Sequence, residues 1–296
     1  VKAGERVGLV GETGCGKTTT VKSILRVLPV PPAQVTDGEI NYRGRNVLAM
    51  GKKQMQALRR HELTAIFQDP LQSLNPVFTI GTQLRDIVKD SAIGQGKRLS
   101  RHAVEARCIK ALRETGMPDP ERIMTNYPIQ LSGGMRQRVC IAEALSTTAW
   151  LLLADEPTTN LDVTIQDQIL RKLDDLVEKK NTSVLMITHS LGVVMDLTER
   201  VYIMYAGSMV EEGRTEDLFA QPLHPYSQGL LKSVPKLTGE GISDGIPGRI
   251  PNYLEPPVGC RFHPRCEHVM PVCQMEKPPF FDVENGRQVA CFLYRS

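Results

Sequence analysis

The chain has 296 residues, of which 41% are hydrophobic and 23% are charged, and its formal net charge is +3. These proportions are ordinary for a globular protein with one sizeable core and a small appendage, and the nearly balanced charge argues against a nucleic-acid partner. No apolar run approaches the roughly 18–20 residues that span a bilayer, so any membrane association must go through a partner protein. No signal peptide is visible.

The first residue is Val1, not methionine, and it lies almost at a strand, so we expect the N-terminal part to be missing. The next elements follow from apolar runs, helical periodicity, glycine and proline. In chain order, the predicted elements are a strand at 6–10, a helix at 18–28, strands at 38–42 and 63–67, mostly helix from about 80 to 144, a buried strand at 150–154, a helix at 165–179, a buried strand at 183–187 and a hairpin around 201–210. Alternating strands and helices predict an α/β fold with a parallel sheet.

The composition shifts around residues 222–225, and from Pro235 onward proline and glycine are dense and periodicity fades. We therefore predict a first domain at 1–230, with a helical subdomain at about 80–145, and a C-terminal extension at 231–296.

A glycine-rich turn follows the first strand and opens the first helix. It fits the pattern G-x4-G-K-[ST], whose backbone N–H groups cradle phosphate oxygens. The lysine of this pattern reaches the β- and γ-phosphates, and the hydroxyl after it can bind Mg²⁺. The predicted nucleotide-binding residues are Gly11, Glu12, Thr13, Gly14, Cys15, Gly16, Lys17, Thr18 and Thr19.

Two acidic residues, Asp155 and Glu156, follow the buried strand at 150–154. Carboxylates at the end of a central parallel strand emerge at the ligand crevice. Asp155 suits Mg²⁺, and Glu156 suits a base that polarises the attacking water.

The segment Leu131-Ser132-Gly133-Gly134-Met135-Arg136-Gln137-Arg138 resembles the signature sequence of the ABC ATPases. The resemblance implies three further roles. Gln68 senses Mg²⁺ and contacts a transmembrane partner, Asp162 couples two ATP sites, and His189 contacts the γ-phosphate.

By the same resemblance, two ATPase subunits pack head to tail. Ser132, Gly133 and Gly134 of one subunit then bind the γ-phosphate that is held by Lys17 of the other. The implied fold is an ABC-type ATPase domain with a RecA-like core, an antiparallel β part and a helical signature subdomain, followed by the small cysteine-rich extension.

Three stretches, 67–76, 162–166 and 223–231, are similar to the ATPase subunits of oligopeptide and dipeptide importers. This branch implies ATP-driven peptide import at the cytoplasmic face of the cell membrane. It also implies peripheral association, with a second ATPase subunit, identical or related, two permease subunits and, indirectly, an extracytoplasmic solute-binding protein.

Four cysteines, Cys260, Cys266, Cys273 and Cys291, crowd into the last 37 positions of the sequence. Because this segment has few core-forming residues, we expect a bound metal to stabilise it. Four thiolates suit an iron–sulfur cluster or zinc. The resemblance implies a [4Fe–4S] cluster, with Zn²⁺ as the alternative.

Other readings stay open at the level of sequence. The same branch resembles importers of oligosaccharides, nickel and glutathione. More distant alternatives are an ABC ATPase that does not serve transport and an iron–sulfur redox protein with a vestigial ATPase.

Overall fold

The computed structural model describes residues 1–159, 161–233 and 245–295. The chain forms two compact units that interleave along the sequence. The first unit contains Val1–Glu5 and Val21–Leu185, and the second contains Arg6–Thr20 and Met186–Ser296. Part of the predicted extension, 234–244, lies outside the described residues, and the predicted boundary near 230 stays a prediction.

The first unit carries the strand order β4-β5-β6, in which β4 runs parallel to β5 and Leu63 lies opposite Leu151. Its strands are β4 (Leu63–Ile66), β5 (Leu151–Asp155), β6 (Ser183–Ile187, which begins here) and the hairpin of β2 (Asn41–Tyr42) and β3 (Arg45–Asn46). Its helices are α2 (Lys52–His61), α3 (Pro70–Ser73), α4 (Ile80–Gly94), α5 (Arg101–Glu114), α6 (Pro120–Ile123), α7 (Gly133–Ser146), α8 (Val163–Lys180) and the 3₁₀ turns Val47–Ala49 and Pro128–Gln130.

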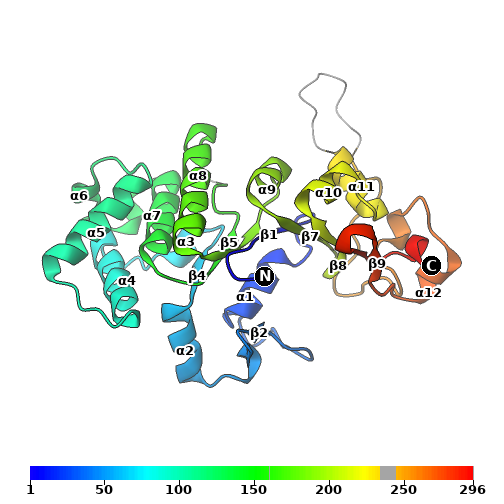
Figure 1. The fold of residues 1–296 in the computed structure, drawn as a ribbon, viewed down its shortest axis with the longest axis horizontal. Helices are drawn as coiled ribbons and strands as arrows, with labels where there is room; N and C mark the ends of the chain where they lie inside the picture. Colours follow the sequence, from blue (N-terminus) through cyan, green and yellow to red (C-terminus); the bar gives the residue numbers. More distant parts are fainter. Residues whose placement is uncertain (160, 234–244, 296) are drawn as a thin grey trace. The chain divides into compact units, whose positions relative to one another are not determined.

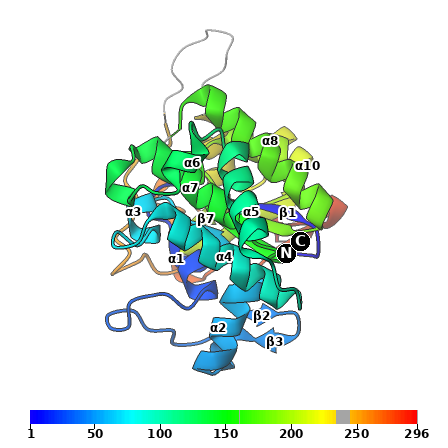
Figure 2. The same ribbon diagram turned by 90° about the vertical axis from the view of Figure 1, so that its left-hand side faces the viewer.

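Helices α4, α5 and α7 pack on one another (Figures 1 and 2). The apolar residues of α5, Val104, Cys108, Ala111 and Leu112, recur at helical spacing, and all four are buried. The predicted signature lies at the start of α7, within this group of helices.

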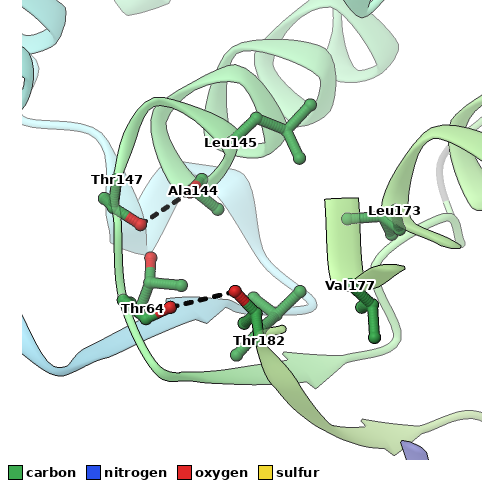
Figure 3. A pocket seen from close by; sticks show the side chains of 9 residues that line it. Thr64, Ala144, Leu145, Thr147, Leu173, Val177 and Thr182 are labelled. Atoms are coloured by element: carbon green, nitrogen blue, oxygen red, sulfur yellow. Dashed lines mark hydrogen bonds between the residues drawn. The ribbon is translucent and has the colours of Figure 1, made fainter. Parts of the chain in front are cut away.

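A small cavity of about 30 Å³ lies between the end of α7, helix α8 and the strands of the first unit (Figure 3). The Thr182 hydroxyl donates to the carbonyl of Ala149 and the Thr147 hydroxyl to that of Ala144, at 3.1 and 2.8 Å. The rest of the lining is mostly apolar, and the volume is about that of one water molecule. We therefore read it as a packing gap and not as a ligand site.

The second unit carries the strand order β1-β7-β8-β10-β9. Strands β1 and β7 are parallel, with Leu9 opposite Tyr202, and the other neighbours are antiparallel. Its strands are β1 (Arg6–Val10), β7 (Arg200–Tyr205), β8 (Ser208–Arg214), β9 (Phe281–Val283) and β10 (Arg287–Val289). Its helices are α1 (Lys17–Ile24, which begins here), α9 (Leu191–Leu197), α10 (Thr215–Ala220), α11 (Pro225–Lys232), α12 (Pro271–Met275) and the 3₁₀ turns His263–Arg265, Glu284–Gly286 and Phe292–Tyr294.

The C-terminal segment is part of the core of the second unit. Phe262 packs against the rings of Tyr205 and Tyr226, with centroids 5.1 and 5.5 Å apart. Arg287 on β10 pairs with the fully buried Glu211 on β8 at 3.0 Å. The segment therefore does not need a core of its own, because it shares the core of the sheet it joins.

Most predicted elements lie where expected, and the clearest differences are β2 and α1. Strand β2 keeps only Asn41–Tyr42 of the strand predicted at 38–42. The predicted helix at 18–28 begins one residue earlier and ends at Ile24. Arg26 adopts a left-handed backbone with φ of 50°, which stops the helix before the prolines do. Within the described ranges, no helix combines the length and the apolar character needed to cross a membrane.

Candidate active site

The phosphate loop lies in the second unit, between β1 and α1, as the glycine pattern predicted. A Cβ atom on Gly11 would lie 2.1 Å from the carbonyl oxygen of Met204, so only glycine fits at this close approach. Gly16 has a φ of 111°, a backbone conformation that residues other than glycine rarely adopt. The loop then opens into α1, whose first turn carries no acidic residue. This helix N-terminus suits an anion.

Lys17 is the charged group at the centre of the loop. Its Nζ donates to the carbonyl of Gly11 at 2.7 Å and to that of Glu12 at 3.0 Å, and the residue is 7% exposed. The thiol of Cys15 lies 3.7 Å from the same Nζ. Burial raises the pKa of Cys15 although Lys17 opposes this shift. A buried ammonium held by carbonyl groups is poised to exchange them for phosphate oxygens.

Of the other predicted residues in the second unit, Thr18 is partly buried, while Thr19 and His189 are exposed. His189 follows β6 and precedes Ser190, whose N–H donates to the hydroxyl of Thr188 at 3.1 Å.

In the first unit, strand β5 ends at Asp155, which is 1% exposed, and Glu156 follows it. Glu156 accepts hydrogen bonds from the Gln68 amide at 3.1 Å and from the Thr159 hydroxyl at 3.0 Å. The predicted magnesium sensor and the predicted base are therefore in direct contact. Glu156 also has a left-handed φ of 49°, a conformation that costs on the order of 1–3 kcal/mol and that clusters at functional sites.

Gln137 lies within the signature segment, but the sequence assigned it no role of its own. It lies on α7, is fully buried, and its amide donates to the carbonyl of Pro157 at 2.6 Å. Pro157 follows Glu156, so Gln137 ties the strained turn to the signature helix. The only signal in the sequence was its place five residues after Ser132, which does not reveal the partner.

Ser132 is the N-cap of α7, and its Oγ accepts from the N–H of Met135 at 3.3 Å. Ser132 and Gly133 are exposed, Gly134 is partly buried, and no acidic residue occupies the first turn. Asp162 caps α8 in the same way, with its Oδ1 accepting from Ile165 at 3.0 Å. Arg138 on α7 lies 3.8 Å from Asp162, so this pair joins the predicted signature and coupling residues.

The four C-terminal cysteines, Cys260, Cys266, Cys273 and Cys291, line one small cavity together with His263 and His268. Burial raises the pKa of the Cys260 and Cys266 thiols, and raises that of Cys291 to about 11. In the part of the chain that the structure describes, no three or more His, Cys, Asp or Glu side chains are grouped so that they could hold a metal ion.

Family models match two parts of this chain: the ABC transporter model at residues 1–159, and the C-terminal region of oligopeptide/dipeptide transporters at 210–273. A probable peptide ABC transporter ATP-binding protein of Sinorhizobium fredii is 45% identical, over 99% of this chain and 86% of its own. The oligopeptide transport ATP-binding protein AppD of Bacillus subtilis is 43% identical, over 99% and 88%.

Among solved structures, a dimeric ATP-binding cassette in a post-hydrolysis state with ADP and Pi matches with a TM-score of 0.64 and 26% identity. The match covers 73% of this chain and 87% of that one. These likenesses confirm the ABC ATPase fold and the ATPase activity that its motifs predict. The chain belongs to the ABC transporter ATP-binding family, within the group of oligopeptide and dipeptide transport ATP-binding proteins.

Proposed function

We propose that this chain hydrolyses ATP to energise the import of dipeptides or oligopeptides through an ABC transporter complex. The observation that carries the proposal is the identity of 45% and 43% to the two peptide-transport relatives, each along 99% of this chain. The phosphate loop, the acidic pair at the end of β5 and the signature helix supply the chemistry.

The proposed roles follow from the contacts of each residue. Lys17 exchanges its two carbonyl partners for phosphate oxygens, while Thr18, Asp155 and Gln68 hold Mg²⁺. Glu156 takes a proton from the attacking water, and His189 contacts the γ-phosphate. Phosphoryl transfer depends on positioning and charge neutralisation more than on covalent chemistry, and this set provides both.

The exposed start of α7 supports an arrangement of two subunits. A helix of 14 residues with an exposed serine–glycine N-terminus and no acid in its first turn is suited to bind the γ-phosphate of a neighbouring subunit. We propose that Ser132, Gly133 and Gly134 act on ATP held by the partner, and that Asp162 couples the two sites. The pair would work at the cytoplasmic face of the membrane with two permease subunits, served by a solute-binding protein.

Peptide import can be tested on the assembled complex in vesicles. Adding the solute-binding protein loaded with a peptide is expected to stimulate ATP hydrolysis and peptide uptake together, because transport couples the two. In parallel experiments, the solute-binding protein is loaded with an oligosaccharide, nickel or glutathione in place of the peptide. Stimulation by one of these and not by peptides would reassign the solute, and no coupling with any of them would overturn the transport role.

We further propose that the four C-terminal thiols hold a [4Fe–4S] cluster, with zinc as the alternative. The described side chains are not grouped for a metal ion as they stand, so the thiols would have to draw together on binding it. The support is that all four cysteines line the same cavity and that four thiolates suit either group. The cluster would be structural, fastening a segment that joins the sheet at β10.

Metal analysis can show directly whether the four cysteines hold an iron–sulfur cluster or zinc. Protein purified without oxygen is expected to contain about four iron and four sulfide per chain, as a thiolate-ligated [4Fe–4S] cluster requires, and to be coloured. Cys266→Ser should lose the iron and lower the unfolding temperature, while Cys108→Ser, a buried cysteine far along the sequence from the cavity, should keep the iron. One zinc per chain would favour the alternative, and metal-free wild-type protein would contradict both.

A further inference from the structure

An arginine of the cysteine-rich segment pairs with the phosphate loop. Arg265 immediately precedes Cys266, and its guanidinium donates to both carboxylate oxygens of Glu12, at 2.9 and 3.2 Å. The side chain of Arg265 is 4% exposed and that of Glu12 is 23% exposed. The two residues are 253 positions apart in the sequence, yet both belong to the second unit.

The guanidinium of Arg265 is fixed in one orientation. Besides Glu12, it donates to the carbonyls of Pro247 and Ile246 at 2.9 and 3.0 Å, and one of its nitrogens lies 3.4 Å from the Tyr205 hydroxyl. Every one of its three nitrogens thus has a partner. The ring of Phe262 stacks at 6.0 Å from the guanidinium carbon. Because the donors are directed by these contacts, Arg265 holds Glu12 in a defined place.

Two other contacts fasten the same loop to its surroundings. The backbone N–H of Glu12 donates to the hydroxyl of the fully buried Tyr226 at 2.8 Å. Arg261, which follows Cys260, donates to the carbonyl of Ala206. Gly207 follows Ala206, and its backbone N–H donates to the carbonyl of Cys15 at 2.8 Å. Both arginines that flank cysteines therefore reach the loop or the turn that supports it.

We propose that Arg265 is a positioning residue for nucleotide binding, and that the cysteine-lined segment is a structural part of the ATP site. Arg265 holds the loop in its cradle shape and neutralises the one carboxylate within it. Without Arg265, the Glu12 carboxylate would face the incoming phosphates with its charge uncompensated. This inference rests on the proposed role of the loop at 11–18, and it adds a residue that the phosphate-loop pattern does not contain.

The proposal predicts a specific coupling between two substitutions. Arg265→Met should weaken MgATP binding about tenfold, the size typical of a coupled pair, and should raise KM more than it lowers kcat. Glu12→Gln alone is measured as the second single variant of the cycle, because it changes the loop itself. The double variant should recover most of the lost affinity, because it leaves no unpaired carboxylate beside the phosphates. A merely structural role for Arg265 would lower the unfolding temperature and leave the KM of the folded protein unchanged.

The measurements are titration of the purified full-length chain with a fluorescent ATP analogue, steady-state ATP hydrolysis and thermal unfolding. The matched control is Arg287→Met, which breaks the other buried arginine–glutamate pair of the second unit, at 3.0 Å from Glu211. It should lower the unfolding temperature and leave ATP affinity unchanged. If Arg265→Met does not fold, Arg265→Lys with and without Glu12→Gln replaces it in the cycle.

Three results would overturn the inference: wild-type affinity in the folded Arg265 variant, equal loss of affinity in the Arg287 control, or no recovery in the double variant. Failure of the underlying function looks different, since the wild-type chain itself would then neither bind nor hydrolyse ATP.

Discussion

A Glu156→Gln variant is expected to bind MgATP with nearly wild-type affinity and to hydrolyse it about 1,000 times more slowly. General-base catalysis contributes roughly 100- to 10,000-fold to a rate, and an amide cannot take a proton from water at neutral pH. The amide oxygen of glutamine can still accept from Gln68 and Thr159, which lie 3.1 and 3.0 Å from the carboxylate. The substitution therefore removes the base and preserves the turn.

The variant is measured by phosphate release and by nucleotide titration. Because ATP is bound but not consumed, pairs of subunits should accumulate in its presence and be visible as a larger species in size-exclusion chromatography. Glu105→Gln is the matched control, since it makes the same change in a half-buried ion pair with Arg85 at 2.6 Å, which joins α4 and α5 and contains no predicted site residue. Normal turnover in the Glu156 variant would refute its role as the base.

The elements that the sequence predicts well are those with local causes. Residues 151–154 of β5 and 184–187 of β6 are uninterrupted apolar runs, and such runs are typical of strands buried on both faces. The burial of α5 follows from spacing alone. The phosphate loop was predictable because a strand, a glycine turn and a helix follow one another directly in the chain.

The features that escaped prediction depend on partners far away in the sequence. Strands β9 and β10 have three residues each, and β10 forms because Gln288 and Val289 pair with Glu212 and Glu211 of β8. A strand of three residues is too short for its sequence periodicity to predict it. The contact between Gln137 and Pro157 and the ion pair between Arg265 and Glu12 leave no pattern either, because one polar side chain finds another only after folding.

The same distinction applies to the site. Motifs name which residues bind phosphate and magnesium, but they do not say what holds them in place. The contacts of Glu156 with Gln68, and of Arg138 with Asp162, are visible only in the folded chain. The supporting residues are therefore where the structure adds most to the motifs.

Replacing Lys17 with methionine is expected to weaken MgATP binding roughly 100-fold, because truncating one member of a desolvated charge contact costs several kcal/mol. Methionine keeps much of the length of the side chain, so the loop loses the ammonium while retaining most of the packing. The matched control is Lys22→Met, which removes a charge from the last turn of the same helix. Equal affinities for the wild-type and Lys17 proteins would contradict the role of this lysine.

The Lys17 variant also tests whether two subunits share each ATP site. Ser132→Arg places a bulky cation at the start of α7, so it should block turnover while leaving Lys17 intact in its own chain. Each variant alone should be inactive. In an equal mixture that forms pairs, half of the pairs are mixed, and each mixed pair unites an intact phosphate loop from one chain with an intact signature from the other. About a quarter of the sites are then complete, so activity should return. If mixed pairs form, as tagged copies can show, and the mixture stays inactive, the two motifs do not meet across the pair, because sites built within one chain cannot be complemented.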